Sequence, residues 1–268
     1  MTAPADDPAR HRRGWFARGF RDRYVLRYVR KHFHAVRLSN ASSPLPAGDA
    51  PLIVVLNHPS WWDPMTGTVL TREFGEHREH FVAIDAEMLK KYPFFKLIGF
   101  VGVDTHSLRG AAEFLRTATT LLSKPNRVLW VTAQGEFSDV RTRPLGLRSG
   151  VGHLAARLGR GFVLPVAFEY TFWTERTPEA LVRVGPAVDV AEAPGRGGRE
   201  WTARIEQALT ETLDGLNADA MARDPARFTP LLGGAAGVGG VYDGFRRVRA
   251  WLTGRRFRPA HADPGTGP

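Results

Sequence analysis

Short apolar segments rich in β-branched residues alternate with helical segments between residues 33 and 222, and this alternation constrains the fold more than any other feature. The clearest segment is 52–57, LIVVLN, whose continuous apolar run is typical of a strand buried on both faces. The expected strands are residues 33–40, 52–57, 80–85, 99–104, 126–135 with its final glycine turn, 161–173, and 180–190 as one strand or a hairpin. The expected helices are residues 14–33, 60–71, 109–124, 148–159 and 199–222, with a short one in 86–104 that breaks at Pro93. Because interleaved helices bury their apolar faces on a sheet, we expect an α/β fold with a mixed, largely parallel sheet flanked by helices.

Composition limits the classes of protein to which the chain can belong. Its 43% hydrophobic content and mean hydropathy of −0.25 suit a soluble or peripheral protein, and no run approaches the roughly 18 apolar residues of a membrane-spanning helix. The absence of cysteine excludes disulfides, thiolate metal ligands and a cysteine nucleophile. Residues 1–16 lack a basic start followed by an apolar stretch, so no secretory signal is expected and the cytoplasmic side is the expected location.

The basic charge is concentrated near the two ends of the sequence. Lys and Arg outnumber Asp and Glu by 37 to 27, which gives a net charge of +10. Residues 10–37 hold ten Lys or Arg against one acid, Asp22, and six arginines lie within 246–258. Such a surplus suits a polyanionic partner: anionic lipid, nucleic acid or a phosphate-rich ligand.

Residues 14–33 interleave these arginines with aromatic residues. One stripe recurs every four residues and a second is offset from it: Phe16, Phe20, Tyr24 and Tyr28, then Val25, Val29 and Phe33. This pattern is typical of a helix that rests on an anionic membrane, and equally of one that packs its aromatic rings on the protein's own core. The two alternatives are compatible and both stay open. We therefore expect a basic amphipathic, membrane-associating segment in 1–40, an α/β domain in 41–230, and a Gly-rich linker, basic amphipathic helix and disordered tail in 231–268.

The segment NHPSWWDP, 57–64, places a histidine and a carboxylate at the end of the most apolar expected strand. His58 precedes Pro59, which favours an extended backbone for the histidine. Ser60 fits the cap of the following helix, so Asp63 falls in the first turn and can reach back to the imidazole. A carboxylate that accepts a hydrogen bond from one ring nitrogen fixes the tautomer and stabilises the imidazolium. The pair is therefore a candidate general base for a substrate hydroxyl.

The spacing H-x-x-x-x-D is weak on its own, because His80 and Asp85 share it within a single expected strand, where they face opposite sides. Only the change from strand through proline to helix supports the first pair. The alternatives are that Asp63 is only a helix cap and that His58 is a structural histidine.

Four blocks in order over residues 50–170 resemble the glycerolipid (lysophospholipid) acyltransferase family, typified by 1-acyl-glycerol-3-phosphate acyltransferases. The first block is the family's N-H-x-x-x-x-D at a strand end. The others are AEMLKKYPFFKLIGFVGVD, VTAQGEFSD and VLPVAFEY. The residues that match the family's patterns are Asn57, His58, Asp63, Pro93, Phe95, Gly99, Asp104, Gly135, Pro165 and Val166.

The resemblance implies transfer of a fatty acyl group from an acyl-CoA or acyl-carrier-protein thioester to a hydroxyl of a lipid acceptor. His58 would be the base, Asp63 its orienting carboxylate, and 41–230 the acyltransferase domain. The blocks place further substrate-binding residues at Asn57, Gln134, Gly135 and Pro165. No metal or redox cofactor is implied, and the enzyme would be peripheral on the inner face of the cell membrane, against an anionic surface.

The sequence departs from the family where its arginines grip the acceptor's phosphate. Thr105 stands where an arginine usually follows the aspartate of the second block, and in the third block Gln134 and Phe137 replace glutamate and arginine. One alternative is that a nearby arginine supplies the cation: Arg141, Arg143 or Arg148. Another is an acceptor without a phosphate at the site, such as a glycolipid, a glycosylated isoprenoid or carotenoid, or an amino-lipid. The third is that these arginines form a solvated basic loop.

Two other functions compete with the acyltransferase. A non-catalytic membrane- or lipid-binding protein that retained the fold would explain the altered third block, but not the intact His58/Asp63 pair. Nucleic-acid binding rests on charge alone, since no recognised nucleic-acid module is present, and no nucleic-acid partner is expected.

Overall fold

The computed structural model describes residues 7–104, 107–193 and 195–234. The expected C-terminal basic helix and tail, most of the Gly-rich linker, and Thr105 lie outside the described residues.

The centre of the fold is a nine-stranded mixed sheet, with strand order β4-β3-β5-β2-β6-β7-β1-β9 and β8 paired to β6. The strands are β1 (Ala35–Ser39), β2 (Leu52–Leu56), β3 (Glu79–Asp85), β4 (Phe100–Val103), β5 (Arg127–Thr132), β6 (Phe162–Thr171), β7 (Glu179–Val184), β8 (Val188–Asp189) and β9 (Phe228–Gly233). From β4 to β6 every pairing is parallel, as is β1 with β7. The antiparallel pairs are β6–β7, β6–β8 and β1–β9. The expected largely parallel α/β sheet is therefore confirmed.

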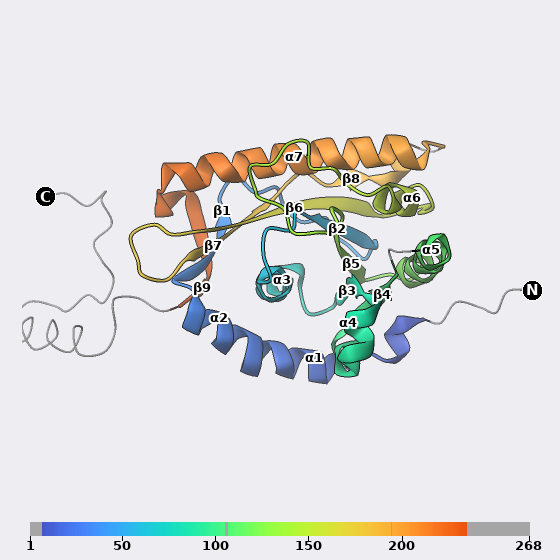
Figure 1. Ribbon diagram of the computed structural model, residues 1–268, viewed down its shortest axis with the longest axis horizontal. Coiled ribbons are helices and arrows are strands. Elements are labelled where there is room, and N and C mark those ends of the chain that lie inside the picture. The colour runs from blue at the N-terminus through green and yellow to red at the C-terminus, as the bar shows by residue number, and fades with distance from the viewer. Residues whose placement is uncertain (1–6, 105–106, 194, 235–268) are drawn as a thin grey trace, which may run out of the picture.

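Helices cover both faces of the sheet (Figure 1). The α-helices are α1 (Gly14–Phe20), α2 (Leu26–His32), α3 (Asp63–Leu70), α4 (Ala86–Lys91), α5 (Leu108–Leu122), α6 (Gly150–Ala155) and α7 (Gly198–Ala222), and a π-helical turn, η2 (Arg21–Val25), joins α1 to α2. Short 3-10 helices are η1 (Pro8–Arg10), η3 (Thr71–Phe74), η4 (Pro93–Ile98), η5 (Val190–Glu192) and η6 (Pro225–Arg227). In the described part of the chain, no helix is both long and apolar enough to cross a membrane.

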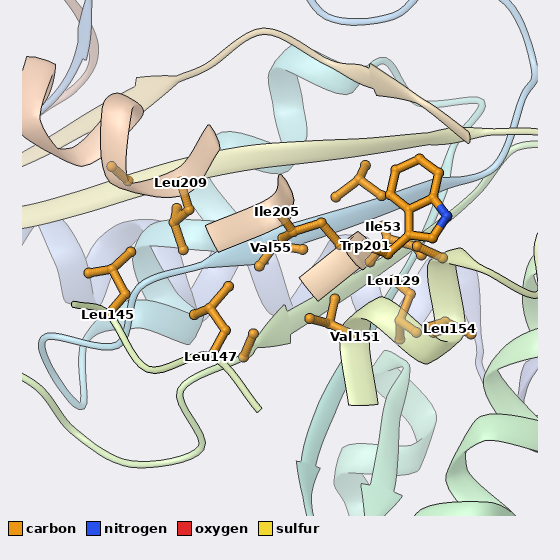
Figure 2. Packing of buried hydrophobic residues seen from close by; sticks show 14 of the residues in the cluster. Ile53, Val55, Leu129, Leu145, Leu147, Val151, Leu154, Trp201, Ile205 and Leu209 are labelled. Carbon is orange, nitrogen blue, oxygen red and sulfur yellow. The ribbon is translucent and has the colours of Figure 1, made fainter. Parts of the chain in front are cut away.

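The hydrophobic core has two halves, one on each face of the sheet, and side chains of β2 contribute alternately to each. Ile53 and Val55 face α5, α6 and α7, where Figure 2 shows them among Trp201 and other helix residues. Leu52, Val54 and Leu56 face the opposite side, together with residues of α2 and α3. Because successive strand residues point to opposite faces, an entirely apolar strand is what a sheet with helices on both sides requires.

The N-terminal helix packs one of its two stripes on the core. Val25, Val29 and Phe33 are buried against the sheet, so this stripe packs on the protein's own core. In the aromatic stripe Tyr24 is exposed, and neighbouring Trp15 is 71% exposed. The helix therefore presents both a buried apolar stripe and exposed aromatic rings.

The sheet extends past both expected domain boundaries. β1 lies within residues 1–40 and pairs with β7 and β9, and β9 runs to Gly233, beyond residue 230. β9 was not expected from the sequence because its segment, FTPLLG, is short and contains Pro230. Pro230 is tolerated since β9 is an edge strand with a register shift opposite Val36 and Arg37.

Candidate active site

The site lies where β2 ends, beyond the carboxyl edge of the parallel strands, where open α/β sheets usually bind ligands. Asn57, 2% exposed, follows β2 and bonds to the backbone of Phe168 on β6. Its side-chain Nδ2 donates to the Phe168 carbonyl at 2.9 Å, and its Oδ1 accepts from the Phe168 N–H at 2.8 Å. We name this double hydrogen bond the Asn57–Phe168 clip. It fixes the end of β2 to β6 and occupies the amide that the sequence suggested for substrate binding.

His58 and Asp63 are in direct contact, with 2.6 Å between Nδ1 and the Asp63 Oδ2. Asp63 is 1% exposed and is the first residue of α3, whereas the His58 side chain is partly open to solvent. An acceptor carboxylate at Nδ1 places the proton there and leaves Nε2 as the basic nitrogen. A histidine held in this way can take a proton from a substrate hydroxyl and return it to a leaving group.

The expected helix start at Ser60 is wrong by three residues. The Ser60 Oγ accepts a hydrogen bond from the Trp62 N–H, but 61–62 form a turn and α3 begins at Asp63. Pro64 in the first turn explains the shift, because proline fits the first helical positions, where no N–H partner is needed.

Burial raises the pKa of the Asp63 carboxyl, and hydrogen bonds from His58, Tyr170 and the Ser60 N–H oppose this rise. The three donors are arranged around both oxygens. Oδ2 receives His58 and the Ser60 N–H at 3.3 Å, and Oδ1 receives the Tyr170 hydroxyl at 2.8 Å. Tyr170 was not expected, because it is 107 residues away in sequence and only the pairing of β6 with β2 brings it near.

Gln134 supports the loop that carries His58. Its Oε1 accepts from the His58 N–H at 2.9 Å, and its Nε2 donates to the Leu145 carbonyl at 3.1 Å. The His58 carbonyl in turn accepts from the Ser138 N–H at 3.0 Å. The third sequence block therefore holds both the N–H and the carbonyl of His58. The buried Gln134 side chain makes its hydrogen bonds to the protein backbone.

Phe137 lies against the imidazole, with 4.3 Å between the two ring centroids. It is 61% exposed, so its ring covers one side of His58 while its outer face remains open. The position at which the sequence resemblance leads one to expect an arginine thus carries an apolar ring beside His58.

The three candidate arginines have different surroundings. Arg141 pairs with Asp139 through two hydrogen bonds of 2.8 and 2.7 Å, which holds the Asp139 pKa well below its usual range. Arg143 pairs with Asp214 on α7. In the described part of the chain, the Arg148 guanidinium makes no hydrogen bond or ion pair. It packs on Gly135, where a Cβ would collide with it and where φ is +73°.

Pro165 lies farther inside the sheet. It is buried in the middle of β6, paired in register with Val55, and packs next to Gly185. No group of three or more side chains able to hold a metal ion occurs among the described residues.

Comparison with known proteins identifies the family. A family model described as Acyltransferase matches residues 32–169, more than half of the chain. Comparison with curated protein sequences gives no match. The fold is similar to the crystal structure of the 1-acyl-sn-glycerophosphate (LPA) acyltransferase PlsC from Thermotoga maritima, with a TM-score of 0.51 and 19% sequence identity, covering 76% of this chain and 80% of that one. These matches confirm the family expected from the four sequence blocks: the chain belongs to the Acyltransferase family and is an acyltransferase.

Proposed function

We propose that this enzyme transfers a fatty acyl group from an acyl-CoA or acyl-carrier-protein thioester to a hydroxyl of a lipid acceptor, with His58 as the general base. The observation that carries the proposal is the 2.6 Å contact between His58 and the buried Asp63 at the carboxyl end of β2. The acyl donor is a co-substrate, and the proposed steps use no metal or redox cofactor.

The reaction needs one proton to move twice. His58 Nε2 accepts the proton of the acceptor hydroxyl as its oxygen attacks the thioester carbonyl. Asp63 stabilises the imidazolium that forms. When the carbon–sulfur bond breaks, the imidazolium returns the proton to the thiolate. The products are an ester and a free thiol, and the enzyme regains its starting state.

We propose that the acceptor presents a hydroxyl without a neighbouring phosphate, as in a glycolipid or a glycosylated isoprenoid. Phe137 offers an apolar ring beside His58, and Arg141 and Arg143 already pair with aspartates. Arg148 is the candidate cation if the acceptor carries an anionic group farther from the reacting hydroxyl, because its guanidinium lies on Gly135 next to the site.

We further propose that the enzyme binds the anionic inner face of the cell membrane through α1, η2 and η4. These elements lie side by side, since the Arg13 N–H donates to the Leu97 carbonyl at 2.9 Å and the rings of Phe20 and Phe94 are 6.3 Å apart. The exposed apolar side chains there are Trp15, Tyr24, Phe94 and Leu97, and arginines flank them. Aromatic side chains at acyl-chain depth with arginines at the headgroups are typical of peripheral binding.

The test is an acyl-transfer assay with labelled acyl-CoA and a panel of acceptors: lysophosphatidic acid, a neutral monoacylglycerol and a monoglycosylated lipid. Transfer to the glycosylated lipid above the other two supports the proposed acceptor, and preferential transfer to lysophosphatidic acid contradicts it. Loss of one acyl chain from a single lipid in a deletion strain would name the natural acceptor. Absence of transfer to every acceptor would favour the alternative, a non-catalytic lipid-binding protein with this fold.

A further inference from the structure

Asp63 has two oxygens, and the proposed reaction accounts for only one of them. Oδ2 faces His58. Oδ1 faces the opposite way and lies 2.8 Å from the Tyr170 hydroxyl, whose oxygen is also 3.0 Å from the hydroxyl of Thr66 on α3. Thr66 is fully buried, and burial raises the pKa of Tyr170 well above its usual value. The phenol therefore keeps its proton across the working pH range.

The strand geometry explains how Tyr170 reaches this position. β2 ends at Leu56, which pairs with Val166, while β6 continues five residues farther to Thr171. The Asn57–Phe168 clip fixes the register at the point where β2 stops. Tyr170 lies two residues beyond Phe168, so its side chain points to the same face of the sheet, toward α3.

Neighbouring elements restrict Tyr170 to this orientation. Its backbone pairs with Ala180 of β7, and its ring packs against Phe33, 5.7 Å between centroids. Phe33 in turn meets the Trp62 ring edge-on at 4.9 Å. A phenol fixed by a strand and by packing positions its partner more closely than a donor on a loop would.

We propose that Tyr170 is a positioning residue of the acyltransferase site: its hydroxyl donates to Asp63 Oδ1 and holds the carboxylate with its other oxygen toward His58. The phenol has a single proton, so when it donates to Asp63 the Thr66 hydroxyl must be the donor in the 3.0 Å contact with the Tyr170 oxygen, and this second hydrogen bond strengthens the first. The site is then a chain of four side chains, from Thr66 through Tyr170 and Asp63 to His58. This inference rests on the acyl transfer proposed above.

The prediction concerns the pH profile, so the charged groups around Asp63 matter. His58 and Tyr170 are its titratable hydrogen-bond partners. On α2, Arg27, Arg30 and Lys31 are exposed and His32 packs against the Trp62 ring; on η3, Arg72 and Glu73 are exposed; and on β9 no residue is charged. On η2, Arg21 pairs with Asp22 and Glu76. Among these groups only His58 and Tyr170 hydrogen-bond to Asp63, so loss of the phenol acts directly on the protonation of the His58–Asp63 pair.

The test compares kcat/KM against pH for wild type, Tyr170→Phe and a matched control, Thr212→Val. Without its phenolic donor, the Asp63 carboxylate is less stabilised, so the pair binds a proton more readily. We expect the acid limb of the profile to move up by about one to two pH units. At a pH below the limb, the rate falls about tenfold for each pH unit by which the limb moves, and most of it returns at higher pH. Thr66→Val should move the limb in the same direction by a smaller amount.

Thr212→Val removes a buried hydroxyl that bonds within α7, which packs on the opposite face of the sheet from α3, so it should lower stability without moving the limb. If Tyr170→Phe leaves the acid limb where wild type has it, the inference is wrong. Should Tyr170→Phe not fold, an unmoved limb in Thr66→Val overturns it. A wild type with no transfer activity would instead overturn the proposed function.

Discussion

Replacing Asn57 by alanine should destabilise the protein more than replacing an exposed asparagine does. The Asn57–Phe168 clip satisfies one buried N–H and one buried carbonyl of Phe168, at 2.8 and 2.9 Å. Asn57 is only 2% exposed, so Asn57→Ala leaves the N–H and the carbonyl of Phe168 without a partner in a buried place. Each unsatisfied buried group costs about 1–3 kcal/mol, so the free energy of unfolding should fall by about 2–6 kcal/mol. For a chain of this size that lowers the melting temperature by at least about 4 °C.

Asn40 provides a matched control. Its side chain also makes two hydrogen bonds, to the Ala226 carbonyl at 2.9 Å and with the Thr229 hydroxyl at 2.8 Å, but it is exposed. Water can replace these partners, so Asn40→Ala should cost less than about 1 kcal/mol. Urea unfolding of both variants, followed by circular dichroism, measures the difference. A loss of unfolding free energy in Asn57→Ala no larger than that in Asn40→Ala would show that the clip does not stabilise the fold as a buried contact.

Three further variants test the site and the membrane surface. Phe137→Arg should raise kcat/KM for lysophosphatidic acid relative to a glycosylated acceptor, because it restores a cation beside His58; an unchanged ratio would contradict the proposed acceptor. Asp63→Asn should lower kcat by about 10³–10⁴-fold, as neutralising the orienting carboxylate does in other His–Asp pairs. Burial raises the folded-state pKa of Asp63, so ionising this carboxyl costs stability, and wild type should lose stability relative to Asp63→Asn as pH rises above 3.8. Urea unfolding measures this, and a free energy of unfolding that increases with pH for wild type relative to Asp63→Asn would contradict the prediction. Finally, Trp15→Ala with Phe94→Ala should reduce flotation with anionic liposomes while kcat on a detergent-dispersed acceptor stays unchanged; equal flotation would contradict the proposed surface.

Much of the fold could be predicted because its signals are local. The continuous apolar run at 52–57 indicates a strand covered on both sides, and β2 is that strand. A strand that forms only because a distant segment pairs with it cannot be predicted from its own sequence. β9 exists because β1 offers it an edge, and its own sequence contains a proline. The start of α3 was misplaced because Ser60 and Asp63 both resemble caps, although Pro64 marks the true first turn.

In the candidate site, too, residues close in sequence could be predicted, whereas contacts between distant segments could not. His58 and Asp63 were found from the sequence because they lie five residues apart, on either side of one turn. Tyr170 was missed because the contact depends on the register between β2 and β6. Sequence alone left Arg141, Arg143 and Arg148 equivalent, whereas the structure separates them by their partners, which lie in α7 and in the loop itself.

We propose His58 as the base for acyl transfer to a lipid hydroxyl, and its removal tests this role most directly. The direct measurement is the rate of ester formation by wild type and His58→Ala with the same labelled acyl-CoA and acceptor, both proteins checked for equal folding. Arg141→Ala, a change at an exposed ion pair with Asp139, serves as the control and should retain most of the wild-type rate. We predict that His58→Ala falls to the uncatalysed background while its melting temperature stays close to wild type. Equal rates for wild type and His58→Ala, whether both measurable or both at background, would show that His58 is not the base for acyl transfer.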